Sequence, residues 1–406
     1  MSDEAHYTII SADCHAGGSH DQYRDYLESR WHEEFDAWRA RYRNPFRDLQ
    51  EGMRIRNWDD EVRRGEQHTD GVVGEVVYPN TIPPFFPSFV LFAPQPRNRE
   101  EYERRHAGIR AHNRWMADFC ARFPAERAGI GQIFLNELDD TVADIEWCVE
   151  HGLRGGILLP NLPPDCDYLP PLHDPVYDRI WEVCQDLGVV VNLHGGTGSP
   201  NYGRYPVADL LFIMDVSFYS HRPFGQLLLS GVFERFPRLR FVMTEQGAAW
   251  LPPLLERMDK VLAQIRDTGR TGELRYGEEH ILPRSATEYF RQNCWLGVSQ
   301  PGPDDAAAAF ELGVDKFLWG SDYPHREGTF PYTREHLRQI FSGVDPDTLQ
   351  RILATNAAEI YGFDLEALEP LARAHGPTHA EIAEPLTELP DEPNEALLKG
   401  VPAMAG

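Results

Sequence analysis

The chain has 406 residues, of which 42% are hydrophobic and 11% aromatic, and its 64 acidic against 39 basic side chains give a formal net charge of −25. This length and composition indicate a globular protein with a large core and argue against an intrinsically disordered chain. The negative charge disfavours nucleic acid and anionic membranes as partners, since both bind basic surfaces. We therefore expect a small-molecule substrate; an anionic one would need a local arginine, lysine or metal ion.

Targeting signals and cysteine spacing point to the cytoplasm. The first ten residues, MSDEAHYTII, lack the basic region and long apolar run of a signal peptide. No apolar stretch reaches the roughly 18 residues that a membrane span needs. The six cysteines include no CxxC pair, which excludes a zinc ribbon and predicts free thiols in a reducing compartment.

Eight short apolar runs alternate with helical segments along the chain. Continuous apolar runs are typical of parallel strands that are covered on both faces. Eight such strand–helix units predict an α/β fold, a closed (β/α)8 TIM barrel. The predicted strands are Tyr7–Ala12, Val72–Tyr78, Ala128–Leu135, Gly155–Leu159, Val189–Leu193, Leu239–Met243, Cys294–Val298 and Lys316–Trp319.

Two segments are predicted to lie outside the barrel, which takes residues 1–363. Residues 19–68 follow the first strand, contain helical patterns and no clear strand, and are interpreted as a cap, an oligomer arm or a structural insertion. Residues 364–406 are acidic and rich in proline, and we expect a peripheral or partly mobile arm there. The protein is expected to form a homodimer or a higher homo-oligomer.

Imidazoles and carboxylates follow four of the predicted strands. The carboxyl ends of barrel strands form one ring, so residues that are distant in sequence converge there. This ligand set suits zinc, manganese or ferrous iron, and we expect one or two divalent ions per chain. Any one of these residues alone is more often a turn or cap residue. The set consists of Asp13 and His15 after the first strand, His194 after the fifth, Glu245 after the sixth, and Asp322 and His325 after the eighth.

Five stretches occur in a fixed order: SADCH, NLHGG, GVFERFPRLRF leading into TEQGAAWLP, WGSDYPH and ILATNAAEIYG. In this ordered set the chain resembles the amidohydrolase superfamily, in the branch related to aminocarboxymuconate semialdehyde decarboxylase and γ-resorcylate decarboxylase. The resemblance extends from about residue 7 to residue 363. It implies a divalent metal held by a pair after strand one, a histidine after strand five and an aspartate after strand eight. At the matching positions stand Asp13 and His15, His194, and Asp322.

The chain departs from the family pattern at two positions. Asp13 replaces the first histidine of the common His-x-His pair, and Glu245 stands where the decarboxylases often have an acid/base histidine. Glu245 is predicted to be a general base for water, a ligand of a second metal, or a group that orients His194. His221 and His325 are the remaining candidate catalytic imidazoles.

Substrate contacts are predicted from weaker signals. Arg222 and Arg326 are candidate carboxylate clamps, and Asn161, at the end of the fourth strand, is a candidate substrate contact. Four phenylalanines between prolines predict either an apolar substrate pocket or a hydrophobic lid: Phe85, Phe86, Phe89 and Phe92.

The expected function is metal-dependent chemistry on a small organic acid or acyl compound. A divalent ion either polarises a carbonyl or carboxylate or makes a water molecule more acidic. The reaction is then hydrolysis or non-oxidative decarboxylation, and Glu245 tilts the balance slightly toward hydrolysis. Two alternatives are a nonheme iron oxygenase, with one or two irons, and a non-catalytic binding protein on a degenerate barrel. Metal analysis and oxygen uptake distinguish the oxygenase.

Overall fold

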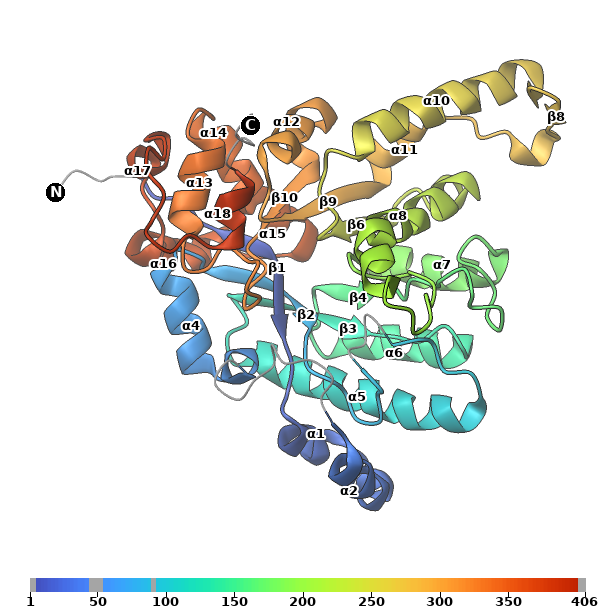
Figure 1. The fold of residues 1–406 in the computed structure, drawn as a ribbon, viewed down its shortest axis with the longest axis horizontal. Helices are drawn as coiled ribbons and strands as arrows, with labels where there is room; N and C mark the ends of the chain where they lie inside the picture. Colours follow the sequence, from blue (N-terminus) through green and yellow to red (C-terminus); the bar gives the residue numbers. More distant parts are fainter. Residues whose placement is uncertain (1–4, 44–53, 89–92, 401–406) are drawn as a thin grey trace.

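The computed structural model describes residues 5–43, 54–88 and 93–400, and its centre is one parallel sheet of eight strands (Figure 1). Each strand pairs with its neighbour in the order β1-β2-β3-β4-β5-β6-β9-β10. All eight predicted strands are present, which confirms the (β/α)8 barrel. They are β1 (Ile10–Ala16), β2 (Gly74–Pro79), β3 (Arg127–Gln132), β4 (Gly156–Leu158), β5 (Val190–His194), β6 (Arg240–Thr244), β9 (Cys294–Ser299) and β10 (Phe317–Gly320).

Helices cover the outside of the sheet, as Figure 1 shows. Their apolar faces and the outward side chains of the strands form the largest core cluster. A smaller cluster, which includes Ile10, Val76, Ile130, Val190 and Val242, fills the barrel interior. The main covering helices are α5 (Arg99–Ala121), α6 (Leu138–Glu150), α7 (Asp178–Leu187), α8 (Ala208–Leu229), α10 (Leu251–Thr268), α11 (Ala286–Asn293), α12 (Pro303–Leu312), α13 (Thr333–Phe341), α14 (Pro346–Gln350) and α15 (Asn356–Tyr361).

The barrel closes where β1 meets the chain just after β10. Cys14 forms a parallel bridge with Tyr323. The His15 amide donates to the Tyr323 carbonyl at 2.7 Å, and the Asp322 amide donates to the Asp13 carbonyl at 2.9 Å. The closing seam therefore brings the polar ends of the first and last strands together.

A bulge in β1 turns Asp13 toward the barrel interior. Ser11 pairs with Glu75 and Cys14 with Val77, so β1 has one more residue than β2 between these pairs. Ala12 lies in the interior cluster, and the extra residue lets Asp13 and then His15 face inward as well. Bulges of this kind commonly re-aim side chains beside active sites.

The segment after β1 is helical in its described part, as predicted, with α1 (His20–Tyr26), α2 (His32–Arg41) and α4 (Asp60–Thr69). Figure 1 shows α1 and α2 at one end of the barrel beside α5. Arg63 of α4 is fully buried, pairs with Glu75 of β2 and donates to the His15 carbonyl at 2.8 Å. The α4 part of this insertion thus supports the strand that carries Asp13 and His15.

The tail forms α16 (Leu365–His375), α17 (His379–Ala383) and α18 (Glu395–Lys399), and it packs on the barrel through buried Leu368 and Leu397. Asn394 donates to the carbonyls of Gly328 and Thr329, at 2.8 and 3.0 Å, in the loop after β10. At the other side of the molecule, α10 and the hairpin of β7 (Arg270–Thr271) and β8 (Leu274–Arg275) project from the barrel (Figure 1). Among the described helices, none is both long and apolar enough to cross a membrane.

Candidate metal centre

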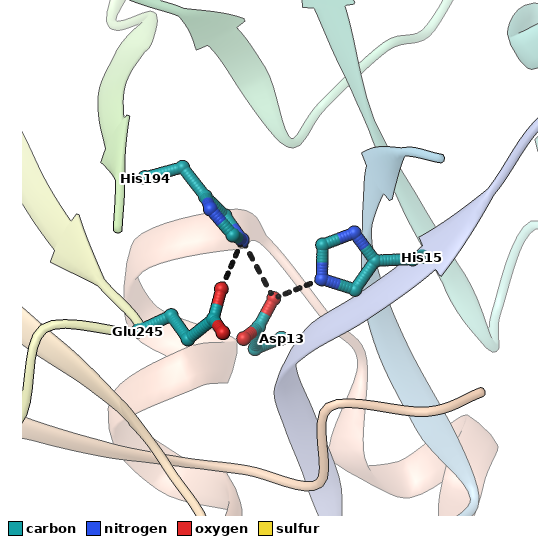
Figure 2. A group of neighbouring side chains, drawn as sticks. All are labelled: Asp13, His15, His194 and Glu245. Atoms are coloured by element: carbon teal, nitrogen blue, oxygen red, sulfur yellow. Dashed lines mark ion pairs between the residues drawn. The ribbon is translucent and has the colours of Figure 1, made fainter. Parts of the chain in front are cut away.

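Four side chains from β1, β5 and the end of β6 meet at the mouth of the barrel (Figure 2). Asp13, His15, His194 and Glu245 each place one potential ligand atom within 4.8 Å of the others. Asp13 Oδ1 lies 3.3 Å from His15 Nε2 and 3.5 Å from His194 Nε2, and Glu245 Oε2 lies 3.1 Å from His194 Nε2. All four are predicted site residues, and the barrel brings them together as expected.

The arrangement fits a bound cation. Asp13 Oδ1, His15 Nε2 and His194 Nε2 are buried and have no hydrogen-bond partner among the described residues. Unpartnered buried polar atoms are rare, because each one forfeits its hydrogen bonds to water. Ligands at about 2.0–2.2 Å from one ion lie roughly 3.0–3.5 Å from each other, which agrees with the separations of these atoms.

Asp322 and His325 form the other side of the cluster, and they group with His15. Asp322 Oδ1 lies 3.3 Å from His15 Nε2 and accepts a hydrogen bond from His325 Nδ1 at 2.7 Å. The other nitrogen of His325, Nε2, lies 3.1 Å from the Asn80 side-chain oxygen. Both ring nitrogens therefore face acceptors, so this geometry favours the protonated imidazole.

The backbone adopts the left-handed region at two site residues, Glu245 with φ 55° and Asp322 with φ 61°. Such conformations are uncommon outside glycine and cluster at functional sites. The Glu245 amide donates to the Gly297 carbonyl at 2.9 Å, which fixes the turn. A Cβ atom at Gly195 would lie 2.1 Å from the Glu245 carbonyl oxygen, so the strand-five turn requires glycine beside Glu245.

The buried charges shift one another's pKa values. Burial disfavours charged imidazole, but Asp13 outweighs this effect and raises the pKa of His15 to about 9. Burial likewise opposes the charge of His194, whose pKa Glu245 and Asp13 raise to about 9. Burial and then repulsion by Asp322 raise the pKa of Glu245 to about 7. Proton exchange at Glu245 is thus possible near neutral pH, which suits a general acid or base.

The structure does not bring His221 and Arg222 into the cluster. His221 stacks on Trp250 with ring centres 3.8 Å apart, and its Nε2 lies 3.3 Å from the Gln246 carbonyl. Burial lowers the pKa of His221 to about 4. Arg222 lies over the ring of Tyr219. Both residues line a cavity of about 860 Å³ between α8 and α10, and neither joins the candidate ligand groups.

Asn161 has a structural contact that the sequence did not suggest. Helix α8 continues through Pro223 without a break. Proline has no amide hydrogen, so the carbonyl four residues earlier, that of Tyr219, loses its usual partner. The Asn161 side chain donates to this carbonyl at 3.1 Å and to Thr197 Oγ1 at 3.1 Å. Asn161 also lines a cavity at the barrel mouth. Arg326, the other candidate carboxylate clamp, is exposed to solvent.

Two residues at the end of β9, Ser299 and Gln300, were not among the predicted site residues. Ser299 donates to Asp13 Oδ2, and Gln300 Nε2 donates to Asp322 Oδ2 at 2.8 Å. They hold the carboxylate oxygens that face away from the centre, a role that is common around metal ligands. The same strand-end rule that selected His194 would have selected them. Of the predicted phenylalanine pocket, Phe89 and Phe92 lie outside the described residues.

The fold and the site define a class of protein: a (β/α)8-barrel enzyme with an imidazole–carboxylate centre at the carboxyl ends of its strands. The model of the amidohydrolase family matches residues 12–363, and the chain belongs to this family. As a member it is a metal-dependent enzyme.

Solved structures share the fold over nearly their whole length. The 5-carboxyvanillate decarboxylase of Sphingomonas paucimobilis is 20% identical, with a TM-score of 0.62, and the match covers 88% of this chain and 100% of that one. The 5-carboxyvanillate decarboxylase of Novosphingobium aromaticivorans, a point mutant solved with manganese, is 19% identical, with a TM-score of 0.65. This match covers 88% of this chain and 97% of that one. The dihydroxybenzoic acid decarboxylase of Polaromonas sp. JS666, solved with manganese and 2-nitroresorcinol, is 16% identical, with a TM-score of 0.60. This match covers 88% of this chain and 97% of that one. At these identities the likeness establishes the fold.

Proposed function

We propose that the protein is a divalent-metal-dependent enzyme that releases carbon dioxide from a small aromatic acid without an oxidant. The main support for a bound metal ion is that unpartnered atoms of Asp13, His15 and His194 converge, among the described residues, at separations that one cation would bridge. We assign Asp322 as the fourth ligand. Both candidate ligand groups contain His15, which favours one ion, of manganese, zinc or iron.

The choice of decarboxylation rests on two supports. Similar barrels include decarboxylases of carboxyvanillate and dihydroxybenzoic acid, and two of those structures hold manganese. A divalent ion at this site supplies charge that polarises a carboxylate or a neighbouring oxygen. Loss of carbon dioxide breaks the bond from the carboxyl carbon to the ring, and the ring carbon then takes a proton. The Glu245 carboxyl, which lies beside His194 at the centre, is placed to donate it, and His325 is a second donor.

Hydrolysis is the second candidate, and the position of Glu245 favours it. In hydrolysis the Glu245 carboxylate would accept a proton from a water molecule that attacks an acyl carbon, and would return it to the leaving group. The same residue thus acts first as a base and not as an acid. The products distinguish the two reactions.

An assay of product and cosubstrate tests this proposal. Protein loaded with Mn²⁺, Zn²⁺ or Fe²⁺ is incubated with hydroxylated benzoic acids, while carbon dioxide release and oxygen uptake are recorded together. We expect carbon dioxide without oxygen consumption, and no turnover after removal of the metal with a chelator. Ester or amide hydrolysis without carbon dioxide would replace the first candidate by the second. Oxygen uptake by the iron form would instead identify an oxygenase.

We also propose that residues 1–363 form the catalytic barrel, with 19–68 as its insertion and 364–406 as its arm, and that the protein acts in the cytoplasm. All six cysteines are free thiols, which supports a reducing compartment.

Self-association through α8 is the proposed oligomer contact. Four apolar residues that share one face of this helix are 63–77% exposed: Leu210, Ile213, Met214 and Phe218. Exposed apolar patches of this kind mark protein contacts. By sedimentation velocity we expect a dimer or larger species that Ile213→Asp dissociates, whereas Phe310→Asp, the same kind of change at an exposed apolar residue of α12, leaves it intact. A monomeric wild-type protein would contradict this assignment.

A further inference from the structure

Gln132 is buried at the mouth of the barrel, and neither end of its side chain is paired within the described part of the chain. It is the last residue of β3, and Ala128 and Ile130 lie in the interior cluster. Since strand side chains alternate, Gln132 also faces the interior. Its backbone is fixed by Asn113, which accepts from the Gln132 amide at 2.8 Å and donates to its carbonyl at 2.9 Å. The side chain is 1% exposed, and both Oε1 and Nε2 lack partners among the described residues.

Arg105 is a buried cation, and two of its three guanidinium nitrogens have no partner among the described residues. It lies on α5, which packs beside β3, and its guanidinium carbon is 4.3 Å from the ring centre of Phe86 and 5.3 Å from that of Phe134. Nη1 donates to the Pro94 carbonyl at 2.7 Å and to Glu101 at 3.0 Å. Nε and Nη2 have no partner among the described residues. These two nitrogens form one edge of the guanidinium, the fork that binds both oxygens of a carboxylate.

Arg105 and Gln132 line the same small hollow. Its volume is about 40 Å³, which admits roughly three groups the size of water, enough for the end of a carboxylate. Ala93, Gln95 and Asn161 belong both to this hollow and to a wider cavity of about 350 Å³. A ligand in the wider cavity can therefore extend one polar end toward Arg105.

The hollow lies beside β4 and β5, and β5 ends at His194. Gln132 pairs with Leu158, and Leu158 pairs with Asn192, two residues before His194. Thr197, which lines the hollow, donates through Oγ1 to the His194 carbonyl at 2.8 Å. One wall is thus shared by the hollow and by the strand that carries a proposed metal ligand.

We infer that Arg105 and Gln132 form a subsite for a second anionic group of the substrate, a carboxylate distant from the one that reacts. The unpaired fork of Arg105 matches the two carboxylate oxygens, and the amide nitrogen of Gln132 adds a third donor. The strongly acidic chain otherwise repels anions. This inference rests on the proposed function, and it narrows the substrate class to dicarboxylic aromatic acids.

Binding of two probe acids to the Mn²⁺-loaded protein tests the subsite. Isothermal titration calorimetry compares isophthalate, which has two carboxylates, with benzoate, which has one. We expect isophthalate to bind about 10- to 100-fold more tightly, the usual effect of charge-assisted hydrogen bonds. In Arg105→Met and in Gln132→Leu the ratio of the affinity for isophthalate to that for benzoate should fall toward one. The affinity for benzoate and the manganese content should stay unchanged.

The controls separate the subsite from the reaction and from folding. Arg104→Met alters the neighbouring residue of α5, a partly exposed arginine paired with Glu34, and should keep the preference. Arg105→Lys retains the positive charge but not the forked pair of donors, and it should lose most of the preference for isophthalate. Thermal melting confirms that each variant is folded. Equal binding of both acids by the wild type, or a preference that survives in Gln132→Leu and in each folded Arg105 variant, would overturn the inference alone. Failure of the manganese-loaded wild type to bind either acid would overturn the proposed function as well.

Discussion

Replacing His194 by alanine should remove the metal ion and reduce turnover by at least about a thousandfold. The imidazole is buried, and its Nε2 lies close to Asp13 Oδ1 and Glu245 Oε2. Without this imidazole, the two carboxylates and His15 would have to hold the ion alone. The ion would then be lost, and with it the positive charge that polarises the substrate. Metal content by inductively coupled plasma mass spectrometry and turnover are measured on the same preparation.

A buried histidine outside the centre provides the control. His106 of α5 pairs with Asp144 at 2.6 Å, so His106→Ala tests the cost of removing an imidazole from the protein interior. That variant should retain its metal and most of its activity, even with a lower melting temperature. Full metal content and full turnover in His194→Ala would show that the assigned ligand set is wrong.

Replacing Glu245 by glutamine should reduce turnover by about 10² to 10⁴, with the metal still bound, if Glu245 transfers a proton. Glutamine keeps the shape of the side chain and its contact with His194, but it can neither give nor accept the proton. A smaller decrease, of about 10- to 100-fold, would indicate that Glu245 only orients His194. Loss of about one metal ion per chain with the other retained would make Glu245 a ligand of a second ion.

The exposed Glu182→Gln on α7 is the control for this change, and it should alter neither quantity. Unaltered rate and unaltered metal content in Glu245→Gln would reject all three roles. Glu245 would then be a residue of the turn after β6 whose left-handed backbone has no part in the chemistry.

The barrel and most of its centre were predictable because both depend on local patterns. Apolar runs mark buried parallel strands, and the residue after each run lies at the barrel mouth. This rule identified His194 and Glu245 directly. It also selected Asp13 and His15, but the reason that both side chains point inward is the bulge between Ser11 and Cys14. A bulge depends on pairing with the next strand, so a single strand sequence does not reveal it.

Contacts between distant segments could not be predicted in the same way. His325 meets Asn80 because the barrel closes between β10 and β1, and the carbonyl freed by Pro223 meets Asn161 because β4 and β5 are neighbours. His221 is a predicted catalytic residue, and nothing in the sequence indicated that it stacks on Trp250 from the continuous helix α8. The unpaired edge of Arg105 likewise needs the positions of Phe86 and Pro94 to be recognised.

Anomalous diffraction from crystals of the metal-loaded protein, recorded at the manganese, iron and zinc edges, tests the central assignment most directly. We expect one anomalous peak per chain, about 2.0–2.3 Å from ligand atoms of Asp13, His15, His194 and Asp322. A loaded, active crystal with no peak at the barrel mouth, or with its peak bound by other residues, would contradict the account.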